Sequence, residues 1–237
     1  MIDKTSGRGL TRRHLLMGLG LSATAAVAGC TTPGSRARII TQPEYGANGG
    51  ALDPAFLSMY GPIEDGGYLI PAIDPSRVDP MYFRQEVADM TGEAPGTIVI
   101  DTANRFAYLT QGNGRAMRYG VGIGREGFSW SGRAEVRYKK KWPTWTPPSE
   151  MVDRQPELEV YRDGMPPGLK NPLGARALYL FQNGKDTLYR LHGTPEYWTI
   201  GKAVSSGCVR FMNHDIIDLY NRVPDGAQVV VNQSGMA

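Results

Sequence analysis

The chain has 237 residues, a formal net charge of +3 at pH 7 and two cysteines. This length suits one good core, or one domain with an extension, and two cysteines exclude a disulfide-rich scaffold. Residues 1–29 contain four basic side chains and one acidic side chain, which accounts for the whole net charge. The remaining chain is therefore near neutral and lacks the basic surface that binds many phosphates, so we predict no nucleic-acid partner.

The first 29 residues have the pattern of an export signal. Arginines, among them the adjacent Arg12 and Arg13, precede a weakly apolar stretch over residues 15–28. That stretch is shorter than the roughly 20 residues that cross a bilayer core. The paired arginines indicate the twin-arginine route. We therefore expect residues 1–29 to be an export signal and the protein to function in the periplasm.

Cys30 follows the sequence Val-Ala-Gly at 27–29, which resembles a bacterial lipoprotein cleavage box. This resemblance implies that Cys30 becomes an acylated first residue and anchors the protein to a membrane. Thr31 is not acidic, which by the same resemblance favours the outer membrane. The alternative is cleavage after Ala28, which would release a soluble periplasmic protein.

Residues 30–94 are rich in proline, glycine, serine and tyrosine, and they show little hydrophobic periodicity. We expect a tether followed by an ordered N-terminal extension. A proline precedes residues 81–90, where the pattern predicts one short helix.

The pattern changes at Pro95, where short segments rich in β-branched and aromatic residues begin. Asn-Gly pairs at 113–114 and 183–184 predict two β-hairpins. A helix with an apolar face is predicted to begin from an Asn213 cap. Residues 95–237 are thus expected to form a mainly β domain with one or two packed helices. The predicted strands cover residues 97–101, 105–111, 115–124, 134–142, 177–182, 187–193 and 227–232.

Cys208 is the one cysteine left if Cys30 is acylated or removed. An odd thiol in an oxidising compartment is reactive or buried; the alternatives are a disulfide to Cys30 and an inert thiol. A zinc site needs three or four ligands, and the nearby candidates are only Cys208, His192 and His214, so we predict no metal. His214 follows the predicted helix cap, and we expect it to be solvated.

His192 and Cys208 have the residue types and the flanking glycines of a nucleophilic site. A cysteine nucleophile needs a base, a group that fixes the tautomer of the base, and N–H groups that bind the oxyanion. His192 would be the base, and the backbone carbonyl of Gly193 would orient it. Gly207 allows close approach of the backbone, so the N–H groups of Gly207 and Cys208 would face the developing negative charge.

The same residues carry a resemblance to a known family. The His-Gly pair at 192–193, the Ser-Ser-Gly-Cys run at 205–208 and Arg210 resemble the signature of the L,D-transpeptidases, whose catalytic domain is called YkuD-type. The likeness extends over residues 95–232. The family's fullest form has Ser-His-Gly-Cys, so Ser206 stands where a second histidine would, and the role of the base carries over onto His192 alone.

The resemblance implies a YkuD-type β-sandwich or barrel-like fold and acyl transfer on peptidoglycan stem peptides, without a cofactor. Cys208 would attack the carbonyl between an L-centre and a D-residue and release the D-residue. An amine of another stem peptide, or of an outer-membrane protein, would then take the acyl group. The alternatives are hydrolysis of the same acyl-enzyme, as in an L,D-carboxypeptidase, and a non-catalytic wall-binding lipoprotein.

Four further residues are candidates for binding substrate. By its motif position, Arg210 would hold a substrate carboxylate through a bidentate contact; a structural ion pair is the alternative. Ser205 would bond to the loop or to the substrate. Trp142 and Trp145 lie in a cationic, aromatic and proline-stiffened segment, which forms either part of a substrate groove or lid, or a solvated edge and a rigid loop. Tyr179, at an alternate strand position, is expected to be core or wall.

Overall fold

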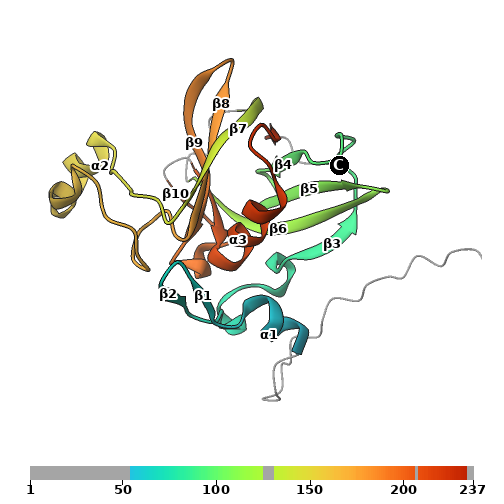
Figure 1. Ribbon diagram of the computed structural model, residues 1–237, viewed down its shortest axis with the longest axis horizontal. Helices are drawn as coiled ribbons and strands as arrows, with labels where there is room; N and C mark the ends of the chain where they lie inside the picture. Colours follow the sequence, from blue (N-terminus) through green and yellow to red (C-terminus); the bar gives the residue numbers. More distant parts are fainter. Residues whose placement is uncertain (1–53, 125–130, 206–207, 234–237) are drawn as a thin grey trace, which may run out of the picture. The chain divides into compact units, whose positions relative to one another are not determined.

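The computed structural model describes residues 54–124, 131–205 and 208–233 (Figure 1). Strands dominate these residues, which confirms the mainly β class. Their helices are α1 (Pro54–Tyr60), α2 (Ser149–Arg154) and α3 (Asn213–Arg222), with 3₁₀ turns η1 (Pro75–Arg77), η2 (Pro80–Tyr82), η3 (Pro156–Tyr161) and η4 (Tyr197–Thr199). Within the ranges given, no helix has the length and apolar character needed to span a membrane.

Both predicted Asn-Gly hairpins are present. The φ angles are 50° at Asn113 and 72° at Gly114, and they are 51° at Asn183 and 76° at Gly184. Positive φ at both central residues is the type I′ geometry, whose twist matches that of the flanking strands. Each turn therefore sets the register of the two strands that it joins. These strands are β5 (Phe106–Gly112) with β6 (Arg115–Gly124), and β8 (Arg176–Gln182) with β9 (Lys185–Thr194).

The strands form a sheet that closes on itself. From β6 the hydrogen-bonded neighbours follow in the order β11, β9, β8, β7, β12, β4 and β5, and β5 pairs again with β6. Two further strands, β3 and β10, also pair with β6. This closure gives the barrel-like arrangement expected from the sequence. The remaining bounds are β3 (Gln85–Ala88), β4 (Ile98–Asp101), β7 (Gly132–Lys141), β10 (Ala203–Ser205), β11 (Val209–Met212) and β12 (Gln228–Asn232).

One face of the sheet builds the main hydrophobic core. Each of the eight strands in the closed path contributes side chains to it, at alternate positions such as Val209 and Phe211 of β11. The helix α3 adds Ile216 and Leu219, which are fully buried. Because alternate residues of a strand point to opposite faces, the residues between these core positions lie on the other face of the sheet.

The part of the N-terminal extension that the structure describes begins at residue 54, and it differs from the prediction. A helix over 81–90 was expected, and this expectation is wrong: Pro80–Tyr82 make a single 3₁₀ turn, and β3 follows it. β3 pairs antiparallel with residues 115–118 of β6. The open edge of β6 supplies backbone hydrogen bonds to this segment, and tertiary pairing of this kind overrides weak helix propensity.

The extension also packs on the start of α3. The Tyr60 hydroxyl donates to Asp215 Oδ1 at 3.0 Å, and Arg84 Nη1 lies 3.6 Å from the same oxygen. His214 Nε2 lies 2.8 Å from the carbonyl oxygen of Gly61. His214 is therefore buried, at 2% exposure, and the expectation of a solvated histidine is wrong because residues 60–61 cover it.

A second contact joins the extension to the sheet through a buried arginine. The strands β1 (Ile63–Asp65) and β2 (Tyr68–Ile70) form a short hairpin. Arg176, at 2% exposure, donates to both carboxylate oxygens of Asp65, at 2.7 Å each. The indole N–H of Trp142 donates to Asp65 Oδ2 at 2.7 Å. The hydrogen bonds from Arg176 lower the pKa of Asp65, with burial opposing them, so this carboxylate is charged at neutral pH.

We expect Asp65→Ala to lower the free energy of unfolding by about 3 kcal/mol, because it leaves the buried Arg176 guanidinium without its anion. Urea unfolding followed by circular dichroism measures this change. Glu86→Ala is the matched control, since Glu86 pairs with Arg115 at the surface and an exposed pair contributes less than about 1 kcal/mol. Equal destabilisation by the two substitutions would contradict the role given to Asp65.

Candidate active site

β9 and β11 lie side by side as parallel strands. Val209 pairs with Leu191, and Arg210 pairs with His192. Cys208 comes immediately before β11, and side chains two residues apart share a face of a strand. His192 and Arg210 thus lie on one face of the sheet, and the same alternation continued by one residue beyond the strand puts Cys208 on that face. Leu191 and Val209 point to the other face, where they are fully buried in the core.

The imidazole of His192 is buried and held by a backbone carbonyl. The side chain is 5% exposed, and Nδ1 lies 2.6 Å from the carbonyl oxygen of Gly193, the partner that the sequence suggested. A carbonyl oxygen only accepts hydrogen bonds, so Nδ1 carries the proton in this contact. Nε2 is then the unprotonated nitrogen, which is the form that can act as a base.

Close packing behind His192 requires a glycine at position 193. A Cβ atom there would collide with Asn213 Oδ1 and would lie 3.1 Å from Ile216 Cγ2. Asn213 was expected to cap α3, but it is the first residue of the helix, and its Oδ1 accepts a hydrogen bond from the Ala175 N–H at 2.9 Å. The start of α3 is thereby fixed against β8 and against the carbonyl that orients His192.

His192 is neutral at physiological pH. Burial lowers its pKa to about 4, and the positive charges of Arg210 and Arg190 act in the same direction. The hydrogen bond with Gly193 opposes them only in part. Desolvation disfavours the charged form of a histidine, so the ring is available to accept a proton well below pH 7.

Cys208 is present as a half-buried thiol. Burial raises its pKa, while a backbone hydrogen bond from Arg190 and the charges of Arg190 and Arg210 oppose the shift. The pKa of His192 is lowered and that of Cys208 is raised, so both shifts favour a neutral pair of thiol and imidazole. A thiolate would form only as the proton moves to His192.

Arg210 already has a partner within the protein. Its Nη1 donates to Glu196 Oε2 at 3.1 Å. The Glu196 side chain is 52% exposed, against 19% for Arg210. The structural ion pair considered from the sequence is therefore present, and a substrate carboxylate would have to share Arg210 with Glu196 or displace it.

Trp142 and Trp145 differ in their surroundings. Trp142 is buried, its ring centre lies 4.2 Å from that of Tyr68, and its N–H is bonded to Asp65. These contacts place Trp142 in the packing of the β1–β2 hairpin. Trp145 is partly exposed, and its backbone forms an isolated bridge with Met165. Of the two, Trp145 is the one with surface to offer a substrate.

Several predicted site residues lie outside the described part of the chain. Gly207 and Ser206 fall in the gap before Cys208, and Cys30 precedes residue 54. The backbone of Ser205 ends β10, where it pairs in parallel with Gly124 of β6; its side chain is not described.

The nearby histidines are engaged with carbonyl oxygens. His192 contacts Gly193 and His214 contacts Gly61. Among the residues that the structure describes, no group of three or more His, Cys, Asp or Glu side chains is placed to hold a metal ion.

The sequence did not identify Arg190 as part of the site. Its backbone hydrogen-bonds to Cys208, and its guanidinium carbon lies 4.5 Å from the centre of the Tyr179 ring. Tyr179 stacks on Tyr138, with ring centres 4.4 Å apart and planes at 19°. Arg190 precedes His192 by two residues, so strand alternation alone could have placed it on the same face.

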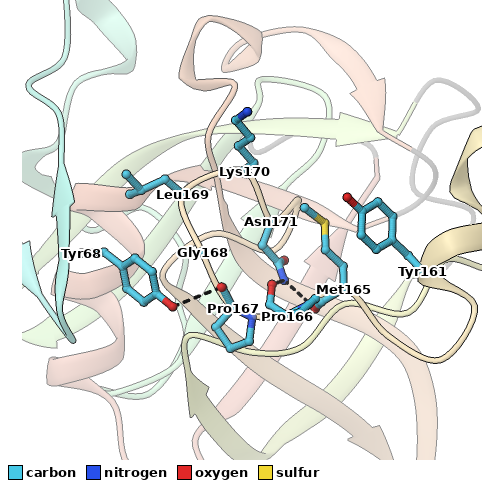
Figure 2. Close-up of a pocket in the computed structure, with 9 residues that line it drawn as sticks. All are labelled: Tyr68, Tyr161, Met165, Pro166, Pro167, Gly168, Leu169, Lys170 and Asn171. Atoms are coloured by element: carbon cyan, nitrogen blue, oxygen red, sulfur yellow. Dashed lines mark hydrogen bonds between the residues drawn. The ribbon is translucent and has the colours of Figure 1, made fainter.

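A separate cavity of about 430 Å³ lies along the loop from Tyr161 to Asn171. Figure 2 shows the Tyr68 hydroxyl donating to the carbonyl oxygen of Pro167, a bond of 3.1 Å, at one side of this cavity. Asn171 braces the loop through hydrogen bonds from its side-chain amide to Pro166 and Met165 (Figure 2). None of the predicted catalytic or substrate-binding residues lines it.

Comparison with known proteins identifies the family. The family model of the L,D-transpeptidase catalytic domain, YkuD, matches residues 95–231, which is more than half of the chain, so this protein belongs to that family. It is similar to "Probable L,D-transpeptidase YbiS" of Escherichia coli K12, with 37% identity over 138 residues. It is also similar to "Probable L,D-transpeptidase YcfS" of that strain, with 35% identity over 137 residues.

These alignments are partial. They cover 56% of this chain, 43% of YbiS and 42% of YcfS, so the chain spans less than half the length of these relatives. A Brucella melitensis structure described as a probable carnitine operon oxidoreductase is 45% identical, covering 64% of this chain and 94% of that one, with a TM-score of 0.47. L,D-transpeptidase 3 of Mycobacterium tuberculosis is 17% identical, covering 58% and 60%, with a TM-score of 0.43.

We expect alkylation of Cys208 by iodoacetamide to be slow at neutral pH and to rise about tenfold per pH unit toward the thiol pKa, because the thiolate is the reactive form. Peptide mass mapping separates Cys208 from Cys30. A rate that reaches its plateau below pH 7 would reveal a preformed thiolate and would contradict the neutral pair.

Proposed function

We propose that this protein is an L,D-transpeptidase that transfers an acyl group between peptidoglycan stem peptides, with Cys208 as nucleophile and His192 as general base. The observation that carries the proposal is the β9–β11 pairing, which aligns His192 with Arg210. Strand alternation continued by one residue before β11 puts Cys208 on the same face as Arg210 and His192. The buried imidazole, oriented by Gly193, supports the role of the base. Membership of the L,D-transpeptidase family supports the reaction type.

In the first half-reaction, Nε2 of His192 takes the thiol proton as the sulfur of Cys208 attacks the carbonyl carbon between an L-centre and a D-residue. A carbon–sulfur bond forms, and the carbonyl oxygen becomes an oxyanion. N–H groups of Gly207 and Cys208 would bind that oxyanion. Collapse breaks the carbon–nitrogen bond, and the imidazolium returns its proton to the departing amine.

In the second half-reaction, an amine attacks the thioester on Cys208 and His192 accepts the amine proton. The sulfur departs and regains a proton, so the thiol and the neutral imidazole are restored. The acceptor would be the side-chain amine of another stem peptide or an amine of an outer-membrane protein. Water in place of the amine would give an L,D-carboxypeptidase, and a wall-binding lipoprotein without catalysis is the third candidate; the intact Cys208 and His192 favour the first two.

Substrate binding is proposed for the groups around this pair. Arg210 would hold a carboxylate in competition with Glu196, Ser205 would bond to the substrate or to its own loop, and Trp145 would supply a flat apolar surface. Trp142 is better explained by its packing against the β1–β2 hairpin.

Export completes the proposal. Residues 1–29 would direct the protein to the periplasm, where peptidoglycan lies, and Cys30 would carry the lipid that anchors it, with the outer membrane favoured. The mass of the mature amino terminus tests this proposal: an acylated chain that begins at Cys30 is expected, and an unmodified terminus would contradict the anchor.

We expect Cys208→Ala to lower turnover of tetrapeptide muropeptides by at least about a thousandfold, because the nucleophile is lost and the site has no other thiol. The change removes a half-buried sulfur atom, so the melting temperature should move by only a few degrees. Mass spectrometry of the products and a thermal melt measure the two effects. Activity retained in the variant would overturn the mechanism.

The same products separate the candidate reactions. Cross-linked dimers or exchanged D-amino acids are expected from a transpeptidase. Shortened tripeptides alone would indicate the hydrolase, and no conversion by the wild-type protein would indicate the non-catalytic alternative.

A further inference from the structure

The strands next to His192 carry two rows of side chains that run across the sheet on the face of the site. In the first row, Tyr138 of β7 pairs with Tyr179 of β8, which pairs with Arg190 of β9. Continuing the β9–β11 register by one residue brings this row to Cys208. The row is therefore a path that leads from the thiol across three strands.

The second row runs beside the first. Lys140 of β7 pairs with Ala177 of β8, Ala177 pairs with His192 of β9, and His192 pairs with Arg210 of β11. Lys140 is two residues from Tyr138, so it shares the face of the first row. The backbone positions of His192 and Lys140 are thus in one line across the sheet, separated by that of Ala177.

The bulge in β7 explains why this lysine reaches the site face. The register of β7 against β8 shifts between Val136 and Tyr138. Val136 is in the core, and without the shift Tyr138 and Lys140 would point to the core as well. After the shift Lys139 takes the core side, where its ammonium donates to the carbonyl of Tyr220 at the end of α3 at 2.9 Å.

The first row forms a rigid wall. Tyr138 and Tyr179 stack with ring centres 4.4 Å apart, and the guanidinium of Arg190 lies over Tyr179 at 4.5 Å. Asp186 clamps Arg190 through two hydrogen bonds of 2.7 and 2.8 Å. Tyr179 is itself buried, at 9% exposure, so the partly exposed Tyr138 and Arg190 provide the outer surface of this wall. Planar groups held in this way bind at little cost in conformational entropy.

The positive charges on this face differ in how they are balanced. Arg190 is paired with Asp186, and Arg210 is paired with Glu196. Lys140 is exposed, its ammonium lies 5.6 Å from the ring centre of Tyr179, and among the described residues no carboxylate forms an ion pair with it. An uncompensated cation in line with the base is placed to bind an anion of the substrate.

We propose that Lys140 and the Tyr138–Tyr179 wall form a subsite that binds a carboxylate of the acyl-donor peptide. The inference rests on the proposed function and names the chemistry of its donor: an acidic peptide. The backbone of Lys140 lies two strand spacings, about 10 Å, from that of His192. An extended peptide covers about 3.3 Å per residue, so the bound carboxylate lies within about three residues of the carbonyl under attack.

The test compares donors that differ only in charge. The purified full chain is given a set of tetrapeptide donors in which one carboxylate at a time is replaced by its amide, and kcat/KM is measured for each. For the wild-type protein, one such amide should lower kcat/KM about tenfold, the effect of losing a partly exposed charged hydrogen bond. Lys140→Gln should lower kcat/KM for the acidic donor by a similar factor. In this variant, kcat/KM should be the same for the acidic donor and for that amide.

Two variants serve as controls. Lys140→Arg keeps the positive charge, so it should retain most of the preference, in kcat/KM, for the acidic donor over its amide. Lys185→Gln removes a lysine at the far end of β9, next to the hairpin turn, and should leave the discrimination unchanged. The rate of Cys208 alkylation should be the same in all these variants, which shows that the nucleophile is intact.

The experiment separates a failure of the subsite from a failure of the proposed function. If the wild-type protein turns over the donors and Lys140→Gln loses as much kcat/KM as the wild type on changing the acid to the amide, the subsite is wrong. The proposed function would then still stand. No turnover of any donor by the wild-type protein would overturn the proposed function and the subsite together.

Discussion

The parallel pairing of β9 with β11 is the constraint on which the proposed chemistry depends. The side-chain period of a strand is two, so a slip of one residue would turn Cys208 toward the core and bring Val209 to the site face. β11 has only four residues, but β6 and β9 flank it. Type I′ turns fix the hairpins to which both neighbours belong. The core residues Val209 and Phe211 then make the correct register the one that buries apolar surface.

The burial of His192 and Cys208 sets their protonation states. Burial disfavours the protonated imidazole of His192 and the deprotonated thiolate of Cys208, because both are charged. Before substrate binds, the proton is therefore on the sulfur. Arg190 and Arg210 add positive charge, yet each is paired with a carboxylate of its own. In the proposed mechanism, proton transfer to His192 and attack on the substrate would therefore be linked steps. The hydrogen bond of Nδ1 to the Gly193 carbonyl leaves Nε2 of His192 unprotonated.

Much of this arrangement could be predicted from local sequence. Asn-Gly turns, alternating strands and the His192, Gly193 and Cys208 set follow from residue types and short spacings. What could not be predicted depends on distant parts of the chain. Residues 81–90 form a turn and a strand because the edge of β6 is open to them, and His214 is buried because residues 60–61 cover it. Lys140 faces the site because of a bulge, which depends on the pairing of β7 with β8 and has no local signal.

The acyl-enzyme itself is the most direct test. Intact-protein mass spectrometry after brief incubation with a tetrapeptide donor, followed by peptide mapping, reports both the mass and the position of any adduct. The proposed mechanism predicts a thioester on Cys208 whose added mass equals that of the donor less the free D-amino acid that it releases, and which is lost on adding an acceptor amine. An adduct at another residue, or turnover of the donor without any adduct on Cys208, would contradict the pairing of Cys208 with His192 as the catalytic centre.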